Sequence, residues 1–302
     1  MGSWRVPVTH GSVGVTLDGL HFQIIGLPSP AGYVAVIAKY VPCRRGGPWR
    51  RPSSELCRVT REYGPLGVED AALRGGISLV WDPSYGASMP YLEEANILWA
   101  IDPWAAAVDV YRRGSPIAAA TAKLSEALGI RGFGLTGSTA MGIEVEGHSD
   151  LDLVVDQHDA PKVYEAWMEV VKPVPTEASE GGVVIGDTLE WRRGYCCGLH
   201  VSWIGVPREP AAHCKPLKRY PAIDPPARMW RGRIKVEPLQ PGALLYPPCV
   251  ETIEGLYLVS YEYNAARLLY EGGDLIVEGV ASSEAIYLGA RPNPGKIARA
   301  RS

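Results

Sequence analysis

The feature that most constrains the fold is a glycine-serine pair followed, twelve residues later, by the first of two aspartates. Gly137-Ser138 ends a short apolar stretch, and Asp150 and Asp152 stand at the start of the apolar run 151–155. Residues two apart on a strand point to the same face, so we expect both carboxylates to project together. The pattern predicts a short strand, a tight turn and a second, buried strand.

The residue types in this stretch suit a nucleotide and a divalent cation. Glycine lets the backbone approach a ligand closely, and serine offers a hydroxyl and an N–H to phosphate oxygens. Two carboxylates on one face repel each other unless a cation lies between them, and hard cations prefer oxygen ligands. We therefore expect Gly137 and Ser138 to bind a nucleoside triphosphate. Asp150 and Asp152 are expected to hold Mg²⁺ or Mn²⁺ for phosphoryl or nucleotidyl transfer.

These residues resemble the nucleotidyltransferase fold of the DNA polymerase beta superfamily, whose signature is Gly-Ser, a loop of about ten residues and Asp-x-Asp. The run Gly-Ser-Thr-Ala at 137–140 and the later Asp-Leu-Asp look most like archaeal CCA-adding tRNA nucleotidyltransferases. The resemblance covers roughly residues 113–206, about a third of the chain. The N-terminal run 18–42 is similar to the front domain of archaeal proteins predicted to be nucleotidyltransferases.

The resemblance implies an enzyme that moves a nucleoside monophosphate from a nucleoside triphosphate to an acceptor and releases pyrophosphate. The resemblance leaves the acceptor unidentified and allows an RNA, a protein or a small molecule. Asp150 and Asp152 would be its catalytic and metal-binding residues.

The sequence departs from the family pattern at the third carboxylate, which members usually carry on a later strand. The matching run here, 199–204, contains no acid, although His200 and Ser202 share one of its faces. The nearest acids are Asp187 and Glu190, on the first arm of a predicted hairpin that joins strand 188–193 to strand 199–204 through Gly194. We expect Glu190 to be the third catalytic carboxylate, although a solvent-facing position is the commoner one for such a residue.

Two classes of function therefore stay open. One is the nucleotidyltransferase described above. The other is a non-catalytic nucleotide- or RNA-binding regulatory protein that keeps the fold without a complete carboxylate triad. The position of Glu190 distinguishes them.

The order of predicted elements indicates an α/β (α+β) protein with three domains. A nucleotidyltransferase-like mixed sheet with flanking helices is expected over 113–206, preceded by a mainly β domain at 1–112 and followed by another at 207–302. The first domain is expected to contain three strands and a helical end, and the second a helix between a Ser115 cap and a Gly129 stop. The expected elements are strands 13–17, 20–25, 33–41, 133–136, 151–155, 255–263 and 275–280, and helices 88–113, 117–128 and 160–171.

Basic residues gather in two segments, although the formal net charge of −3 excludes a globally polycationic protein. The segment 44–61 is an arginine-rich loop, and the segment 207–235 is Pro-rich and reads as a linker or extended arm. Either segment suits contact with RNA, and either suits neutralisation of a triphosphate.

Six cysteines are too few for a disulfide scaffold, and none forms a Cys-x-x-Cys pair. Adjacent strand residues face opposite sides, so Cys196 and Cys197 are not expected to share a metal ion. The sequence contains no run of eighteen apolar residues, and its N-terminus lacks a signal-peptide pattern. We therefore expect a cytoplasmic protein without membrane contact.

Overall fold

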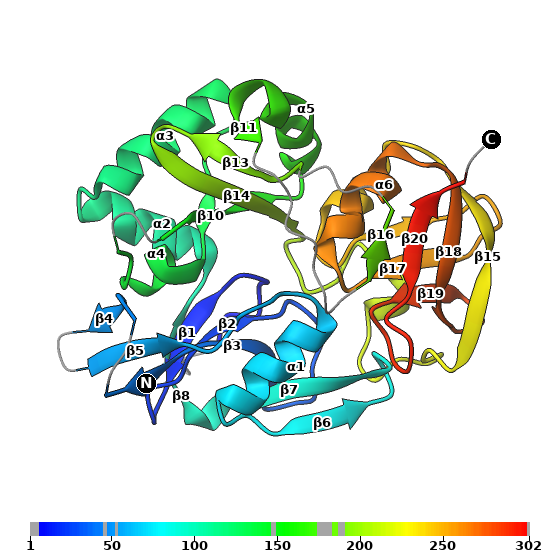
Figure 1. Ribbon diagram of the computed structural model, residues 1–302, viewed down its shortest axis with the longest axis horizontal. Coiled ribbons are helices and arrows are strands. Elements are labelled where there is room, and N and C mark those ends of the chain that lie inside the picture. The colour runs from blue at the N-terminus through cyan, green and yellow to red at the C-terminus, as the bar shows by residue number, and fades with distance from the viewer. Residues whose placement is uncertain are drawn as a thin grey trace.

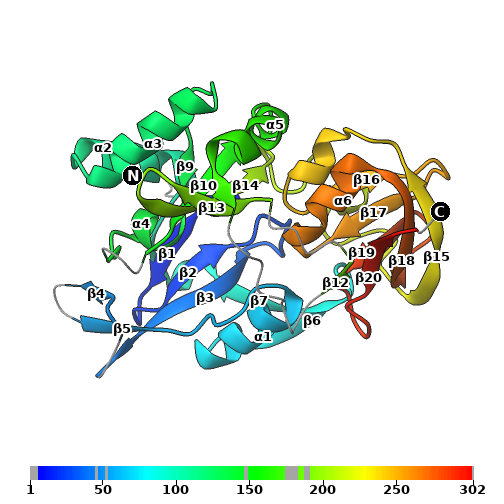
Figure 2. The ribbon, with the colours of Figure 1, turned by 45° about the horizontal axis from the view of Figure 1, so that its top comes forward.

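The computed structural model describes residues 6–44, 47–51, 54–145, 149–173, 183–186 and 191–300. The protein is a strand-rich mixed α/β structure with three sheets. The sheets form three lobes around a common centre, and Figure 1 shows the first lobe in blue and cyan, the middle lobe in green and the third in yellow to red. The turned view in Figure 2 keeps the same arrangement, so the centre of the molecule is bordered by all three lobes.

The first lobe is an eight-stranded sheet with β3 as its longest strand, and helix α1 packs against β3 and β7. Strands β1 to β3 confirm the predicted strands at 13–17, 20–25 and 33–41. The elements are β1 (Val13–Thr16), β2 (His21–Ile24), β3 (Tyr33–Cys43), β4 (Arg50–Arg51), β5 (Ser54–Arg58), α1 (Pro65–Arg74), β6 (Leu79–Asp82), β7 (Ala87–Glu93), η1 (Glu94–Asn96) and β8 (Ile97–Ile101).

The predicted helix over 88–113 is wrong for residues 88–102, slightly more than half of its length. Residues 87–101 form β7, η1 and β8, and a helix begins only at α2 (Pro103–Arg112). Pro90 lies inside β7. In the interior of a helix it would have removed one backbone hydrogen bond, because proline has no N–H group. Asp102 starts α2 instead, because its carboxylate accepts hydrogen bonds from the backbone N–H groups of Trp104 and Ala105 at 2.9 and 3.0 Å.

The middle lobe contains a five-stranded mixed sheet in the order β11-β13-β14-β10-β9, with β10 and β14 parallel. Its helix α3 begins at Ser115, whose hydroxyl accepts from the backbone N–H of Ile117 at 3.3 Å, and ends before Gly129, as predicted. The elements are α3 (Pro116–Ala127), β9 (Gly134–Leu135), α4 (Gly137–Met141), β10 (Leu151–Asp156), α5 (Ala160–Val170), β11 (Lys172–Pro173), β13 (Arg193–Cys196) and β14 (Leu199–Val206).

A hairpin forms here, but its first strand and its turn both lie later than predicted. β13 begins at Arg193, the last residue of the predicted strand 188–193, of which residues 188–190 lie outside the described ranges. β13 and β14 pair antiparallel from Arg193 opposite Ser202, and the connection is Cys197-Gly198 rather than Gly194. Gly194 lies inside β13, where an added Cβ would be 2.4 Å from the carbonyl oxygen of Lys172. Glycine is therefore needed there for the close approach of β11, not for a turn.

The third lobe is a seven-stranded sheet that also takes one strand from an earlier part of the chain. β12 (Val184–Ile185) pairs in parallel with β20 (Lys296–Arg299), and α2 packs against β9 and α4 of the middle lobe. Contacts between residues far apart in the sequence thus cross the predicted domain boundaries at 113 and 206. The boundaries themselves stay a prediction. The remaining elements are η2 (Lys215–Leu217), β15 (Arg228–Val236), η3 (Pro241–Leu244), β16 (Cys249–Glu251), β17 (Tyr257–Ser260), η4 (Tyr263–Ala265), α6 (Ala266–Glu271), β18 (Gly273–Ala281) and β19 (Ala285–Leu288).

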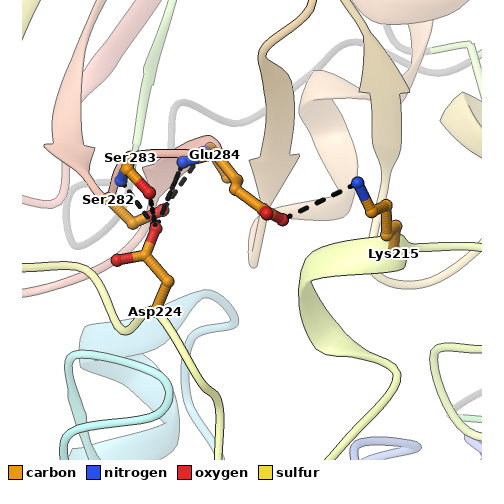
Figure 3. A network of polar contacts seen from close by, with 6 residues as sticks. Lys215, Asp224, Ser282, Ser283 and Glu284 are labelled. Atoms are coloured by element: carbon orange, nitrogen blue, oxygen red, sulfur yellow. Dashed lines mark hydrogen bonds and ion pairs between the residues drawn. The ribbon is translucent and has the colours of Figure 1, made fainter.

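The segment 207–235 is not a free arm. Its last part, β15, pairs with β18 along its whole length. Figure 3 shows how the middle of the segment is held: one carboxylate oxygen of Asp224 accepts from the N–H and hydroxyl of Ser283 at 2.7 and 2.6 Å. The hydrogen bond from Ser283 lowers the pKa of Asp224, and Lys215 lies 3.9 Å from Glu284.

Four of the six cysteines form disulfides, which the cysteine count did not predict. The pairs are Cys43–Cys57 and Cys214–Cys249. Disulfides are usual in oxidising compartments and also occur inside hyperthermophiles, so the cytoplasmic location stays a prediction. In the described ranges, no helix has the length and apolar character needed to cross a membrane.

Candidate active site

The tight turn predicted at Gly137-Ser138 is the first turn of the short helix α4. Asp152 lies between this glycine-serine turn and the neighbouring strand β14. Ser202 Oγ donates a hydrogen bond to Asp152 Oδ1 at 2.7 Å, from the paired position on β14. On the other side, Gly137 has a φ of 66°, and a Cβ at this position would lie 2.4 Å from Asp152 Oδ2. Only glycine fits both the backbone angle and the space, so the sequence motif and the tertiary contact have the same cause.

Asp150 stands at the start of the same strand and is exposed. Partial desolvation and the neighbouring Asp152 carboxylate raise the pKa of Asp150, while His200, Arg193 and Arg58 act in the opposite direction. Asp150 and Asp152 are therefore near enough to repel each other, as expected for two carboxylates on one face. Magnesium is commonly held by one or two carboxylates together with substrate phosphates, and this donor pair fits that arrangement.

Ser138, the second residue of the turn, is buried and contacts the first lobe. Its hydroxyl and that of Tyr40 share a hydrogen bond, and only 6% of Ser138 is exposed. Burial raises the pKa of Tyr40, and the nearby Asp152 carboxylate adds to the shift. The phenol of Tyr40 therefore stays protonated beside the turn.

Two cations from the first lobe stand near the aspartates. Lys39, on β3, is only 3% exposed, and its ammonium donates to the Tyr63 hydroxyl while lying 4.5 Å from the centre of that ring. Arg58 Nη2 donates to the same hydroxyl at 3.4 Å. Burial by itself would raise the pKa of Tyr63, but Lys39 and Arg58 lower it overall despite the opposing charge of Asp152.

Arg58 belongs to the predicted basic segment, but sequence reasoning missed Lys39 and Tyr63. The available signal was a single lysine inside the otherwise apolar run 33–41. A buried lysine is rare unless it is paired. A lysine on a core strand therefore predicts a polar or anionic partner close to it.

The third carboxylate is not found on β14. Ser202 occupies the position beside Asp152, and within the described ranges no group of three or more His, Cys, Asp or Glu side chains forms a metal site. Glu190 and Asp187 lie outside the described residues, as do Gly147 and His148 of the motif loop. The assignment of Glu190 therefore stays a prediction.

A cavity of about 160 Å³ opens beside Asp152 where the three lobes meet. Its wall includes His10, which stacks on Tyr246 with ring centres 3.8 Å apart. Burial, with a smaller contribution from Lys39, lowers the pKa of His10 to about 3, so the imidazole is neutral. The cavity wall is mainly apolar, and its aromatic side chains are Tyr63, Tyr85, Trp203, Tyr246, Tyr261 and Tyr263.

Cys196 and Cys197 face the same side, contrary to the expectation from strand geometry. Their sulfur atoms lie 2.9 Å apart, because Cys197 begins the hairpin turn with a φ of 57°. Burial and the adjacent thiol raise the pKa of Cys196 to about 11. No disulfide joins these two described cysteines.

Comparison of the chain with protein-family models, with curated proteins and with solved structures finds no match. Its function is therefore inferred from the side chains and their geometry.

Proposed function

We propose that the protein is a nucleotidyltransferase that transfers a nucleoside monophosphate from a nucleoside triphosphate to an acceptor. The observation that carries the proposal is the contact of Asp152 with both Gly137 and Ser202. A turn able to approach phosphate and a carboxylate pair able to hold a cation are thereby brought together. The mixed sheet around them supports assignment of the middle lobe to the nucleotidyltransferase fold.

Each residue has a distinct part in this proposal. Gly137 and Ser138 contact the triphosphate, and Lys39 and Arg58 offset its negative charge. Asp150 and Asp152 hold Mg²⁺ or Mn²⁺, which supplies charge neutralisation at the phosphates. Positioning and charge neutralisation account for most of the catalysis in such transfers.

The reaction balances without a further reagent. A hydroxyl oxygen of the acceptor attacks the α-phosphorus, and a new P–O bond forms. The bond from the α-phosphorus to the bridging oxygen breaks, and pyrophosphate leaves with that electron pair. The proton of the attacking hydroxyl passes to solvent, or to Glu190 if this carboxylate reaches the site.

A second candidate function is a nucleotide-binding regulatory protein without turnover. It is favoured by Ser202, which offers oxygen but no charge at the β14 position beside Asp152. In this case the phosphate-binding contacts persist and no label is transferred. RNA remains an alternative partner for both functions through segments 44–61 and 207–235, although Arg231 and Arg233 lie 4.0 and 3.1 Å from Glu278 and Asp274.

Transfer can be tested with each nucleoside triphosphate labelled in turn at the α- or γ-phosphate. The protein is incubated with Mg²⁺ or Mn²⁺ and with separate RNA, protein and small-molecule fractions. The proposal expects α-label, not γ-label, on one fraction. Retention of γ-label would instead show phosphoryl transfer, and the absence of both would favour the binding protein.

The matched variants are Asp152→Asn and Asp156→Asn. Asp156 lies on the same strand and face, and its carboxylate accepts from the backbone N–H of His158 at 2.9 Å, a contact that asparagine preserves. We expect Asp152→Asn to lose at least a hundredfold in transfer and Asp156→Asn to stay near wild type. Equal activity of the two variants would contradict the assignment.

Glu190→Gln separates the two candidate functions. If Glu190 is the third carboxylate, this variant loses transfer by about a hundredfold, in line with typical general acid–base contributions, while nucleotide binding persists. Full transfer by the variant would remove Glu190 from the catalytic set.

A further inference from the structure

The cavity between the lobes is not used by the phosphate contacts described above. Among the described residues, its wall includes Asp152, Ser202 and Arg193, and also Glu262 of the third lobe. The phosphate turn lies on the other side of Asp152, since β9 and Gly137 flank one edge of β10 and β14 flanks the other.

This order of elements favours the cavity as the acceptor side. In a nucleotidyl transfer the attacking oxygen and the leaving oxygen are roughly in line through the phosphorus. With the triphosphate over Gly137 and Ser138, the acceptor approaches from the side of Asp152 that faces Ser202. That side opens into the cavity.

Glu262 is the buried polar group in the cavity wall that most requires a partner. Only 5% of the residue is exposed, and no described residue donates a hydrogen bond to its Oε2 atom. The carboxylate accepts one backbone hydrogen bond, from Asn264. Tyr261, also in the wall, has a buried hydroxyl without a described partner.

An unpaired carboxylate oxygen in a buried wall is costly, because it loses its hydration and gains no donor. A ligand with an N–H donor removes that cost. An ammonium group is favoured further by the faces of the surrounding tyrosine rings, which attract cations. Arg192 and Arg193 stand near Glu262, but Arg192 Nε donates to Asn264 and its guanidinium carbon lies 5.6 Å from the Tyr263 ring centre.

We propose that this cavity binds a small molecule that carries an ammonium group, with Glu262 Oε2 and the Tyr261 hydroxyl as its partners. On the proposed function, this molecule also carries the attacking hydroxyl and is the acceptor, in place of RNA. The ammonium group lies at the Glu262 end, and the remainder of the molecule extends past Tyr246 toward Asp152.

The test uses two probes of nearly equal shape, tyramine and 4-propylphenol, which differ by an ammonium group in place of a methyl group. Binding to the full chain is measured by calorimetry without nucleotide or metal, so the result does not depend on transfer. We expect at least tenfold tighter binding of tyramine. Glu262→Gln should reduce that preference to twofold or less, and Tyr261→Phe should weaken tyramine binding between twofold and tenfold.

Glu209→Gln is the matched control, since Glu209 is exposed and lies outside the cavity wall. It should bind both probes as wild type does. Circular dichroism melting confirms that each variant is folded, and Tyr261→Phe provides a test if Glu262→Gln does not fold.

The proposal would be overturned by no measurable tyramine binding, by equal affinity for the two probes, or by a tyramine preference that survives in Glu262→Gln. Displacement of tyramine by a single-stranded RNA oligonucleotide, dependent on Glu262, would also overturn it and assign the cavity to RNA. Failure of nucleotide transfer with intact tyramine selectivity would reject the proposed function and the acceptor role, but leave the ammonium site supported.

Discussion

The two sides of Asp152 differ in how their polar groups are satisfied. On the proposed phosphate side, around Gly137, Ser138 and Lys39, hydroxyls and charges bond to one another. Ser138 shares a hydrogen bond with Tyr40, and Lys39 donates to Tyr63, whose ring also borders the cavity. On the cavity side, the Glu262 carboxylate keeps an oxygen without a described donor. A paired side holds a fixed geometry, whereas an unpaired side gains most from a ligand that supplies the missing hydrogen bond.

The largest effect is expected from Gly137→Val on the phosphate side. A β-branched residue at a φ of 66° costs roughly 1–3 kcal/mol of stability, and its Cβ collides with Asp152 Oδ2. We expect nucleotide affinity, measured by calorimetry with Mn²⁺, to fall at least a hundredfold. Gly114→Val is the control, because Gly114 has a φ of 64° with no atom within 4 Å of an added Cβ. Similar nucleotide affinities for the two variants would show that the turn is structural only.

The cavity side should show a pH dependence of stability through His10. The folded protein holds the pKa of His10 at about 3, below the ordinary value of 6.5, so the unfolded state binds a proton first as the pH falls. This contribution to stability is complete above pH 6.5 and is lost toward pH 3, with about 2 kcal/mol lost by pH 5. Urea melts of wild type and His10→Asn between pH 8 and 5 measure it. If the stabilities of wild type and His10→Asn changed with pH in the same way, the low pKa of His10 would be contradicted.

Asp150→Asn is expected to act less strongly than the glycine variant. Asp150 is exposed, and removing its charge also relieves the repulsion with Asp152. We expect metal-dependent nucleotide affinity to fall about tenfold, or about 1.4 kcal/mol, because one of two anionic ligands is lost. Calorimetry with and without Mn²⁺ measures the metal-dependent part of the nucleotide affinity. Unchanged affinity would argue against a cation shared by the two carboxylates.

The smallest effect is expected from the titration of Glu262. It changes the stability with pH in the opposite direction to the titration of His10. Burial raises the pKa of Glu262, although Arg192 and Arg193 offset part of the shift. The folded state therefore keeps its proton to higher pH than the unfolded state, and stability falls as the pH rises between the two pKa values. The free energy of unfolding of the wild type, relative to that of Glu262→Gln, should therefore fall as the pH rises across that window. A difference independent of pH would mean that the carboxylate titrates normally.

Local sequence signals predicted several elements correctly, and their failures have a physical cause. Ser115 and Gly129 delimit α3 because caps and stops act within one turn of a helix. The helix predicted over 88–101 failed because spaced apolar residues also suit strands, and pairing of β7 with β3 and β6 decided between them. The pairing of Cys43 with Cys57 likewise depends on β3 and β5 being neighbours.

The amino-acid sequence by itself determined the need for glycine at 137 and the strand that starts directly after Asp150 and contains Asp152. These two features led to the prediction of a nucleotide site. These features depend on backbone angles and strand periodicity within about twenty residues of chain. The tertiary structure decided the rest: Lys39 and Tyr63 reach the site from the first lobe, and Glu262 reaches the cavity from the third. No local pattern encodes such contacts, because they form only when distant strands pack and bury their polar groups together.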